Sequence, residues 1–505
     1  MILSDLCSAA GLSCPADAAQ IAVGDICTDS KKLIAGQLFV ALRGMHANGH
    51  AFLHDAAARG ACAALIDQDY AGEIPQGLCT IRATDTRAAL AYLLDAWHGK
   101  PSEKMQFVGI TGTNGKTSVA WLLYGLLKNA QIPCAMIGTV KCEGPLGEIP
   151  KDVSDSANMT TPEPEQLYPM LAEFARQGVK IVVMEVTSHA LAQERCAPLH
   201  FTLGIYTNLT RDHLDYHGTM EAYFAAKKKL LAQCDRVLLG MDDERVASLR
   251  AQAPCDVLSC SAKHKSADFY AEEVAYFATG VQYKLVSANA RLRIACPVSG
   301  HFAVLNSLQA SAAALLLGVK AQSVRDGMAL VPPIPGRMER VPLGAGIPFS
   351  VIVDYAHTPD ALENLLAAVR RSKTRAGRVV LVFGCGGDRD KGKRAQMGQI
   401  ASRMADYFVI TADNSRTEPL DDIIADIVRG VDRRAHYRVL RDRRSAIRHA
   451  IEHARAGDVI LLAGKGHENY EIDQNGRHAF DERAIVQEAI NDYWRTVQQE
   501  TEQGE

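Results

Sequence analysis

Short apolar runs alternate with amphipathic stretches along most of the chain. Runs at residues 106–110, 180–184, 203–206 and 236–239 read as strands, and residues 118–130 and 221–231 read as helices. Strands that alternate with helices favour a parallel sheet with helices on both faces. The hydrophobic pattern therefore predicts an α/β fold.

Two interruptions divide this pattern. Residues 100–104 are polar and contain proline, and residues 332–336 contain three prolines and a glycine, so both read as boundaries. Before the first, residues 37–42 resemble a strand and 83–97 a helix. After the second, strand-like runs recur at 349–353, 378–383, 407–411 and 459–463. With about 100–200 residues per domain, we expect three domains: residues 1–100, 101–334 and 335–505.

Composition narrows the function classes. The chain has 48% hydrophobic and 22% charged residues, as is typical of a globular protein. Its net charge of -3 shows no excess of basic residues, so nucleic acid is not the expected partner. It lacks the pattern of a signal peptide and any apolar run of about 18 residues, so we expect no membrane insertion and a cytoplasmic location. The 13 cysteines include no CxxC pair and are expected to be reduced thiols.

The strongest local motif is a glycine-rich turn placed between a predicted strand and a predicted helix. Glycines let backbone N–H groups surround phosphate oxygens, and the helix N-terminus favours negative charge. Lys116 can reach the β- and γ-phosphates, and the Thr117 hydroxyl can bind Mg²⁺. The spacing departs from the strict P-loop pattern because residue 110 is Ile. The residues predicted to bind ATP here are Gly112, Thr113, Asn114, Gly115, Lys116, Thr117 and Ser118.

Ligand-type residues follow two later strand-like runs. Glu185 would lie at the carboxyl end of a parallel strand, where open α/β sheets bind ligands. Residues 207–218 contain two Asp and two His within six positions, which suits an ion or phosphate site. Mg²⁺ is favoured over zinc because no Cys/His ligand pattern is present. The cluster Lys227, Lys228 and Lys229 could simply be a solvated helix face, and we expect this of two of the three.

At this point the motifs resemble those of the Mur ligases, most closely the MurE type, over nearly the whole chain. The matching segments are GTNGKTS at 112–118, TTPEP at 160–164, MEVTSH at 184–189, TNLTRDHLDYHGTMEAYFAAKKKLL at 207–231, PGRMER at 335–340, DYAHTPD at 354–360, GCGGDRDKGKR at 384–394, DNSRTEP at 413–419 and GKGHE at 464–468.

The resemblance implies a fold and an activity. It implies an N-terminal uridine-nucleotide domain, a central P-loop ATPase domain with a parallel sheet, and a C-terminal Rossmann-like domain that brings the amino acid. The implied enzyme is a monomeric, ATP- and Mg²⁺-dependent ligase of peptidoglycan precursor synthesis. It would add meso-diaminopimelate to UDP-N-acetylmuramoyl-L-alanyl-D-glutamate through an acyl phosphate.

The resemblance also implies roles for single residues. Lys116, Lys227, His213 and Arg337 would be catalytic, and Thr117, Glu185, His213 and a carbamylated Lys227 would hold Mg²⁺. Asn306, Arg337 and Asp354 would contact ATP, with His357 nearby. The nucleotide-peptide would be bound by Thr28, Ser30, Met45, His46, Ala47, Thr160, Thr161, Thr187, Gln193 and Arg195. The amino acid would be bound by Arg389, Asp413, Asn414, Ser415, Arg416, Gly464 and Glu468.

Departures from the family pattern leave alternatives open. Ser415 stands where proline is usual, Thr187 where serine is usual, and Met159 and Ala303 where asparagine is usual. Arg416 favours diaminopimelate over L-lysine, because arginine can bind the second carboxylate of diaminopimelate through two hydrogen bonds. The alternative is that Arg416 pairs with Glu418 on the surface. The remaining alternatives are a ligase adding D-alanyl-D-alanine, a folylpolyglutamate synthase, and a nucleotide-dependent switch without ligation.

Overall fold

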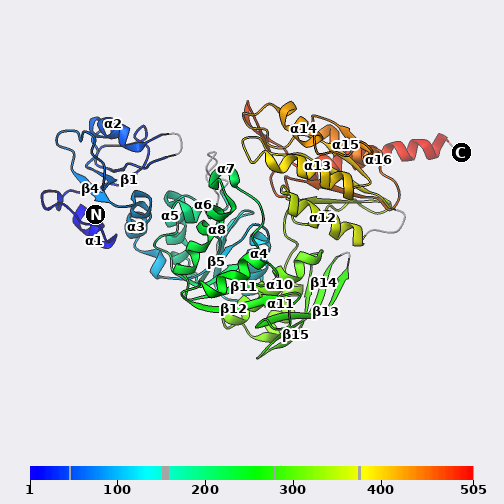
Figure 1. Ribbon diagram of the computed structural model, residues 1–505, viewed down its shortest axis with the longest axis horizontal. Coiled ribbons are helices and arrows are strands. Elements are labelled where there is room, and N and C mark those ends of the chain that lie inside the picture. The colour runs from blue at the N-terminus through cyan, green and yellow to red at the C-terminus, as the bar shows by residue number, and fades with distance from the viewer. Residues whose placement is uncertain (45–46, 150–158, 278, 373–376, 504–505) are drawn as a thin grey trace.

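Three lobes follow one another along the chain (Figure 1). The computed structural model describes residues 1–44, 47–149, 159–277, 279–372 and 377–503. Met45 and His46, both expected to bind the nucleotide-peptide, lie outside the described residues. Each lobe has its own sheet, of four, eleven and six strands in turn, and a separate two-stranded hairpin lies in the third. The chain is thus an α/β protein of three domains.

The N-terminal domain is a small parallel sheet covered by helices. Its helix α3 begins after Asp85, whose carboxylate accepts hydrogen bonds from the N–H groups of Arg87 and Ala88. This cap confirms the predicted helix and moves its start to Thr86. The strands are β1 (Ile26–Cys27), β2 (Leu38–Val40), β3 (Ala63–Asp67) and β4 (Thr80–Ala83), and the helices are α1 (Leu3–Ala9), α2 (Leu53–Ala58) and α3 (Thr86–Trp97).

The centre of the second domain is a parallel sheet with helices on both faces, as predicted. Successive side chains of a strand point to opposite faces, so Phe107 joins one buried cluster and Val108 the other. Figure 1 shows α4 and α10 to the right of β5, and α5 and α6 to its left. The parallel strands, in spatial order, are β12 (Asp256–Ser261), β11 (Arg236–Gly240), β10 (Phe201–Tyr206), β5 (Gln106–Thr111), β9 (Ile181–Glu185) and β6 (Cys134–Ile137).

Helices of unequal length cover the two faces of this sheet. Side chains of α4, α10 and α11 fill one buried cluster, and those of α5, α6 and α8 contribute to the other. The helices are α4 (Lys116–Asn129), α5 (Pro164–Arg176), α6 (Ser188–Ala192), α7 (Leu214–His217), α8 (Met220–Lys228), α9 (Glu244–Ser248), α10 (His301–Leu316) and α11 (Ala321–Ala329). Short 3-10 helices are η1 (Ala16–Ala18), η2 (Gly49–Phe52), η3 (Pro101–Glu103), η4 (Lys229–Gln233) and η5 (Leu249–Ala251).

Antiparallel strands, which the sequence pattern did not predict, extend both edges of the parallel central sheet. Strands β13 (Phe269–Phe277), β14 (Gly280–Ser287) and β15 (Arg291–Cys296) extend one edge, with antiparallel β13–β14 and β14–β15 pairs. Strands β7 (Cys142–Gly144) and β8 (Gly147–Glu148) extend the other edge in the same way. Antiparallel neighbours are joined by short turns and need no crossover helix, so the alternation of strands and helices gave no signal for them.

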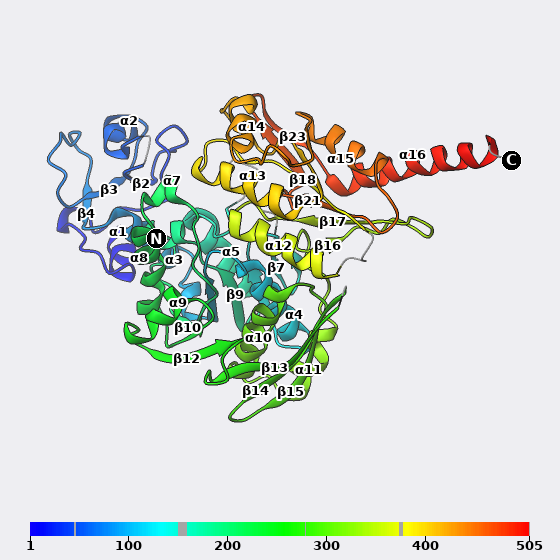
Figure 2. The ribbon, with the colours of Figure 1, turned by 45° about the vertical axis from the view of Figure 1, so that its right-hand side comes forward.

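The C-terminal domain contains a second parallel sheet, with the order β16-β17-β21-β18-β19-β20 and only β16 antiparallel. Figure 2 shows α12 beside α13, and α15 beside α16. The strands are β16 (Glu339–Arg340), β17 (Ser350–Asp354), β18 (Val379–Phe383), β19 (Tyr407–Ile410), β20 (Tyr437–Val439), β21 (Val459–Ala463), β22 (Tyr470–Asp473) and β23 (Gly476–Ala479). The helices are α12 (Pro359–Ser372), α13 (Gly392–Met404), α14 (Leu420–Val428), α15 (Arg443–Glu452) and α16 (Glu482–Gln503).

Two findings bear on location and redox state. Among the described residues, no helix combines the length and apolar character needed to cross a membrane. All thirteen cysteines carry free thiols.

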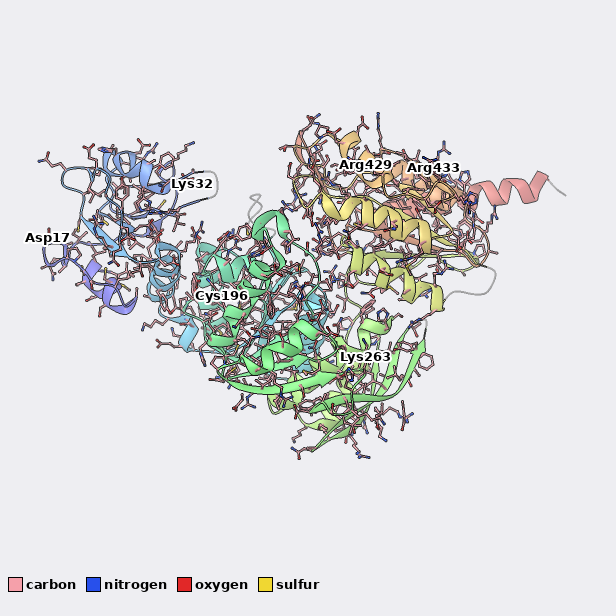
Figure 3. The ribbon with its side chains drawn as sticks, in the orientation of Figure 1. Asp17, Lys32, Cys196, Lys263, Arg429 and Arg433 are labelled. Carbon is pink, nitrogen blue, oxygen red and sulfur yellow. The ribbon has the colours of Figure 1, made fainter. Side chains whose placement is uncertain are left out.

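A buried ion pair lies inside the C-terminal domain. Arg443 and Glu482 are both inaccessible to solvent, and Arg443 Nε donates to Glu482 Oε1 at 2.8 Å. The same guanidinium donates to the carbonyls of Ala412 and Ala463, the last residues before two site loops. By contrast, Arg429 and Arg433 lie on the side of this domain away from the central domain (Figure 3). Arg443 thus ties the end of β21 to the segment that follows β19, two strands that β18 separates in the sheet.

We predict that Glu482→Ala destabilises the C-terminal domain by about 3–5 kcal/mol, because it leaves the Arg443 charge buried without its partner. The matched control is Glu488→Ala, which removes the partner of Arg444 from an exposed pair and should cost about 1 kcal/mol or less. Urea unfolding followed by the fluorescence of Trp494 on α16 measures both variants. Equal stability losses in the two variants would contradict this role for Arg443.

Candidate functional site

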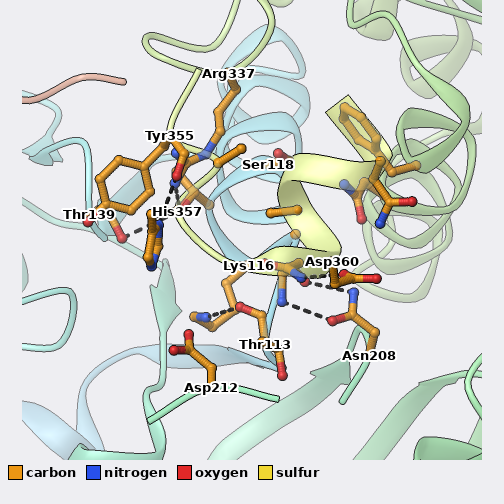
Figure 4. A pocket seen from close by; sticks show the side chains of 18 of the residues that line it. Thr113, Lys116, Ser118, Thr139, Asn208, Asp212, Arg337, Tyr355, His357 and Asp360 are labelled. Atoms are coloured by element: carbon orange, nitrogen blue, oxygen red, sulfur yellow. Dashed lines mark hydrogen bonds between the residues drawn. The ribbon is translucent and has the colours of Figure 1, made fainter. Parts of the chain in front are cut away.

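The strands of both parallel sheets have their carboxyl ends at one region between the central and C-terminal domains. A cavity of about 240 Å³ lies there, lined by residues of both domains. In Figure 4, Thr113, Lys116, Asn208 and Asp212 line the lower part of the pocket, and Arg337, Tyr355 and His357 the upper part. Ligands in open α/β sheets bind at such ends, so this cavity is the candidate active site.

The phosphate loop has the strand–loop–helix arrangement that the sequence predicts. β5 ends at Thr111 and α4 begins at Lys116. Gly112 has φ 142°, and a Cβ on it would lie 1.9 Å from Thr207 Oγ1. Gly115 has φ 89°, and a Cβ there would lie 2.6 Å from Asn306 Oδ1. Only glycine fits at both positions. Of the loop residues, Thr113, Asn114, Gly115, Lys116, Thr117 and Ser118 line the cavity.

Two lysines meet at one carbonyl of this loop. Lys116 Nζ donates to the carbonyls of Gly112 at 2.9 Å and Thr113 at 2.8 Å. Lys227 Nζ, from α8, also donates to the Gly112 carbonyl at 2.9 Å. Lys227 is buried, whereas Lys228 is half-buried and Lys229 exposed. Burial, followed by the nearby Lys116 charge, holds the pKa of Lys227 well below its ordinary value. Lys227 is therefore the one lysine of the three placed at the loop.

Hydroxyl and carboxylate oxygens gather beside Lys116. Thr117 Oγ1 donates to Glu185 Oε2 at 2.9 Å. Glu185 Oε1 accepts from the N–H of Thr139 at 2.7 Å. Thr117, Thr139 and Glu185 all line the cavity, as does His213. Hard oxygen donors next to a phosphate loop suit Mg²⁺. Within the described part of the chain, no group of three or more His, Cys, Asp and Glu side chains forms a metal site.

The segment rich in Asp and His supplies a neutral imidazole to the cavity. Burial lowers the pKa of His213 to about 3, while the charge of Asp212 opposes this shift. The 3.5 Å approach of His213 to Asp212 is therefore no ion pair at neutral pH. Burial likewise lowers the pKa of His357 to about 4, and its Nδ1 lies 2.8 Å from the Tyr355 carbonyl. A neutral imidazole can act as a ligand or a hydrogen-bond acceptor.

The three further residues expected at ATP line the same cavity. Arg337 Nη2 donates to Thr117 Oγ1 at 3.3 Å, and its guanidinium lies 4.5 Å from the centre of the Tyr355 ring. Asp354 accepts hydrogen bonds from the N–H groups of Met338 and Ala356. Asn306 stands against Gly115. The cavity thus combines Asn306, from the same domain as the phosphate loop, with Arg337 and Asp354 from across the domain boundary.

Among the described first-domain residues expected at the nucleotide-peptide, Thr28 contacts the central domain. Thr28 Oγ1 donates to Glu165 Oε1, at the start of α5, at 2.8 Å. Ser30, two residues after Thr28, is buried, and Ala47 is exposed. A second cavity, of about 190 Å³, is lined by residues of both domains: Leu42, Arg87, Leu90, Glu163, Pro164, Glu165 and Gln193.

The central-domain residues expected at the nucleotide-peptide form one hydrogen-bonded set. Thr161 Oγ1 donates to the carbonyl of Glu185, and the N–H of Thr187 donates to Thr161 Oγ1. Arg195, which is buried, donates to Gln193 Oε1 and to the Thr161 carbonyl. Thr160 Oγ1 lies 3.0 Å from Thr139 Oγ1. Thr187 keeps the hydroxyl that the usual serine would supply, and it caps α6.

Two arginines of the C-terminal domain lie close together. Arg416 Nη1 donates to the carbonyls of Gly387 at 2.9 Å and Asn414 at 3.2 Å. Burial and the neighbouring Arg416 charge lower the pKa of Arg389. Glu418, the alternative partner of Arg416, is held instead by Arg394 and Lys391. This arrangement favours an anion-binding role for Arg416 over surface pairing.

The remaining residues expected at the amino acid surround these arginines. Asn414 Nδ2 donates to Glu468 Oε2 at 2.8 Å. Burial and the charge of Asp413 raise the pKa of Glu468. Gly464 has φ 117°, and a Cβ on it would lie 2.7 Å from Asp413 Oδ2. The Ser415 carbonyl accepts from the N–H of Glu418. The loops at 413–416 and 464–468 thus converge.

Several lining residues had not been singled out in the sequence. Asn208 Oδ1 accepts from the N–H of Asn114, and Asp360 Oδ2 accepts from Asn114 Nδ2 at 2.7 Å. Tyr355 lies between the two parts of the site, because Arg337 covers its ring and its hydroxyl lies 3.5 Å from Glu468 Oε1. All three residues stand inside motifs already noted, so their position there was the available signal.

Comparison with known proteins shows which protein family the chain resembles in sequence. Residues 110–314 match the model of the Mur ligase middle domain, and residues 336–466 that of the Mur ligase glutamate ligase domain. The chain belongs to the Mur ligase family. A relative from Clostridioides difficile, named UDP-N-acetylmuramoyl-L-alanyl-D-glutamate--2,6-diaminopimelate ligase, is 38% identical over 478 residues, which cover 93% of this chain and 96% of the relative.

Other Mur ligases agree in sequence and in fold. A relative from Synechocystis with the same name is 39% identical over 493 residues, covering 96% of this chain and 94% of its own. A solved structure, also of a UDP-N-acetylmuramoyl-L-alanyl-D-glutamate--2,6-diaminopimelate ligase, is 31% identical with a TM-score of 0.66, covering 97% of this chain and 99% of that chain.

Proposed function

We propose that the protein is an ATP-dependent ligase that joins meso-diaminopimelate to UDP-N-acetylmuramoyl-L-alanyl-D-glutamate, with release of ADP and phosphate. The observation that carries this proposal is the position of Tyr355. On one side its ring packs under Arg337 of the phosphate pocket, and on the other its hydroxyl approaches Glu468 of the amino-acid pocket. The names of the full-length relatives support the same substrates.

ATP would bind along the first cavity. Its phosphates would lie against the loop from Gly112 to Ser118, with Lys116 and Arg337 as the positive charges. Its base would lie toward Asn306 and Phe302, which line the other part of the cavity. Because Asn114 donates to Asp360, the nucleotide would also touch α12 of the C-terminal domain.

Mg²⁺ fits the oxygen-rich corner of this pocket. Thr117 and Glu185 are in direct contact, and the neutral His213 lines the same cavity. These three residues, with Lys227 as a carbamate, would hold the ion. When bound, it would neutralise charge on the transferred phosphoryl group.

Carbamylation of Lys227 would resolve a conflict between like charges. Lys116 and Lys227 both reach the Gly112 carbonyl, and Lys227 is buried. The ammonium would lose one proton to give the neutral amine, and addition of CO₂ to this amine, with loss of a second proton, would turn the cation into a carboxylate. The result is an opposite-charge pair beside the metal corner in place of two cations.

The nucleotide-peptide would extend from the first domain into this cavity. Its uridine end would contact the residues near the first-domain boundary, together with Met45 and His46. Its peptide end would approach the hydrogen-bonded set of Thr160, Thr161, Thr187, Gln193 and Arg195. The buried Arg195 already pairs with Glu163 at 2.7 Å, so its charge is compensated before the peptide binds.

The amino acid would occupy the pocket of the C-terminal domain. Arg416 and Arg389 would bind its distal carboxylate, and Glu468 its distal ammonium, with Asp413, Asn414, Ser415 and Gly464 completing the walls. L-lysine has the ammonium but lacks the distal carboxylate, so it would forgo the charged contacts with the arginine pair. Two adjacent arginines therefore favour diaminopimelate.

The reaction would proceed in two steps. An oxygen of the D-glutamate carboxylate attacks the γ-phosphorus of ATP, the bond to the bridging oxygen breaks, and ADP leaves. The neutral amine of diaminopimelate then attacks the carbonyl carbon of this acyl phosphate, the nitrogen passes one proton to the departing phosphate, the bond from carbon to the phosphate oxygen breaks, and inorganic phosphate leaves. Lys116 and Arg337 offset the repulsion between the reacting oxyanions, and the domains hold the reactants in line.

We also propose domain limits of 1–100, 101–334 and 335–505, action as a monomer, and a cytoplasmic location. The limits fit the gaps between sheets, since β4 ends at Ala83 and β5 begins at Gln106. α11 ends at Ala329, and β16 begins at Glu339.

The direct test of the proposed function is phosphate release by the purified protein. We expect release only when ATP, the nucleotide-dipeptide and diaminopimelate are all present. Release from ATP alone would favour a nucleotide-dependent switch. Release that depends on D-alanyl-D-alanine or on a folate substrate would favour a sister ligase.

We predict that Lys116→Ala lowers kcat by roughly 10²–10³-fold, because a positive charge is lost where the transition state gains negative charge. The matched control is Lys128→Ala, an exposed lysine of the same helix, which should keep kcat within about twofold. Near-normal turnover in Lys116→Ala would overturn the assignment of the phosphate loop.

We predict that Lys227→Ala loses most activity and that added bicarbonate does not restore it, because no amine remains to carry a carbamate. Lys228→Ala, in the neighbouring position, should retain activity. ¹³C NMR of protein equilibrated with ¹³CO₂ should show a carbamate resonance in wild type and in Lys228→Ala but not in Lys227→Ala. The reverse pattern between the two variants would mean that Lys228, and not Lys227, is the modified lysine.

We predict that wild type prefers diaminopimelate to L-lysine by roughly 100-fold or more in kcat/KM, since lysine lacks the second carboxylate that the two arginines would bind. Arg416→Ala should lose most of this preference. The matched control is Arg429→Ala, because Arg429 lies on the outer side of the same domain. Competition between the two amino acids measures the ratio. A wild type that uses both equally would contradict the assigned substrate.

A further inference from the structure

The reaction as described leaves one buried cation of the C-terminal domain unused. Lys465, in the turn after β21, has a side chain with no exposed surface. Its Nζ donates to Asn414 Oδ1 at 3.0 Å and to the carbonyl of Tyr470 at 2.9 Å. Asp413 Oδ1 lies 3.7 Å away, and the Phe480 ring centre 5.4 Å. A fully buried lysine is rare unless its partners require it.

These contacts fix which way the Asn414 amide faces. Oδ1 accepts from two donors, Lys465 Nζ and the N–H of Ile472, each at 3.0 Å. An inverted amide would set its NH₂ group against both of these donors. Oδ1 must therefore face Lys465, which turns Nδ2 toward Glu468 Oε2 at 2.8 Å. The orientation of Glu468 thus depends on Lys465 through one amide.

The hairpin of β22 and β23 links this amide to the neighbouring arginine. The N–H of Ile472 donates to the Asn414 side chain, and its carbonyl accepts from the N–H of Arg416 at 3.1 Å. Lys465 in turn holds the start of β22 through the Tyr470 carbonyl. Arg416 has φ 54°, a left-handed conformation that a non-glycine residue keeps only when its surroundings impose it. The hairpin is therefore part of the wall that orders this loop.

We propose that Lys465 is a positioning residue that sets recognition of the incoming amino acid's distal ammonium, by orienting Asn414 and through it Glu468. This inference rests on the proposed function, in which Glu468 faces that ammonium. Removal of Lys465 would leave the N–H of Ile472 as the remaining donor to Asn414 Oδ1, which would loosen the amide of Asn414 and with it the carboxylate of Glu468. The arginine pair that binds the distal carboxylate would keep its own contacts with the carbonyls of Gly387 and Asp388.

The discriminating ligand is 2-aminopimelate, which keeps both carboxylates and the reacting amine but lacks the distal ammonium. In wild type we expect diaminopimelate to be preferred by roughly 10- to 100-fold in kcat/KM, the range of a hydrogen bond to a charged group. In Lys465→Met this preference should fall to within about threefold, through a rise in the KM for diaminopimelate. The KM for ATP should stay within about twofold, which separates positioning from a general loss of structure.

A double-mutant cycle tests the path through Asn414. If Lys465 acts through this amide, adding Lys465→Met to Asn414→Ala should change the preference by less than about twofold, because residues in one hydrogen-bond network are not additive. The matched control is Arg477→Met, an exposed cation of the same hairpin packed on the Tyr470 ring. It should leave the preference as in wild type.

Asn414→Asp gives a second route if Lys465→Met does not fold. It keeps an acceptor for Lys465 but places a carboxylate oxygen opposite Glu468, so the preference should fall here too. A wild type that does not turn over diaminopimelate would overturn the proposed function itself. A functional wild type whose preference survives in Lys465→Met, or survives in Asn414→Asp, would overturn the role of Lys465 alone.

Discussion

The site depends on the way two parallel sheets from different domains present their carboxyl ends to one another. The phosphate loop follows β5, Glu185 ends β9, and the segment with Asp212 and His213 follows β10. Opposite them, Asp354 ends β17, and the loops that carry Arg389, Arg416 and Glu468 follow β18, β19 and β21. Phosphoryl transfer to a carboxylate brings anions together, and this arrangement surrounds them with cations from both sides.

Contacts across the boundary make the two halves one site. Arg337 reaches Thr117, Asn114 reaches Asp360, and Arg211 pairs with Asp390. Tyr355 then connects the phosphate pocket with the amino-acid pocket. Each domain alone would hold only some of these site residues. Pairing of the two domains would therefore bring the reactants together in a fixed order.

Much of this could be predicted from the sequence because the motifs are local. Gly112 to Ser118 lies between an apolar run and a helical pattern, and Glu185 ends an apolar run. Lys227 could be separated from Lys228 and Lys229 only through the family resemblance, and the structure shows the burial behind that choice. The expected boundaries also fall in the gaps between the sheets.

The rest depends on contacts between residues far apart in the chain. Asp360 and Tyr355 belong to the site because they contact residues of another domain or loop. The pattern of hydrophobic and polar positions does not predict such contacts. Arg443 and Lys465 look like surface cations in the sequence, yet both are buried and bind loop carbonyls or amides. The antiparallel strands β13 to β15 were missed because they continue a sheet without a helix between them. Arg416 binds the carbonyls of Gly387 and Asn414, because Arg394 and Lys391 hold Glu418.

The most direct measurement follows the oxygen atoms of the D-glutamate carboxylate. When this carboxylate is labelled with ¹⁸O, attack on the γ-phosphorus followed by displacement with the amine transfers one labelled oxygen to the released phosphate. We predict one ¹⁸O per phosphate formed, read by mass spectrometry or by the isotope shift in the ³¹P NMR spectrum. Phosphate without the label would contradict an acyl phosphate and with it the central role of the cleft between the two sheets.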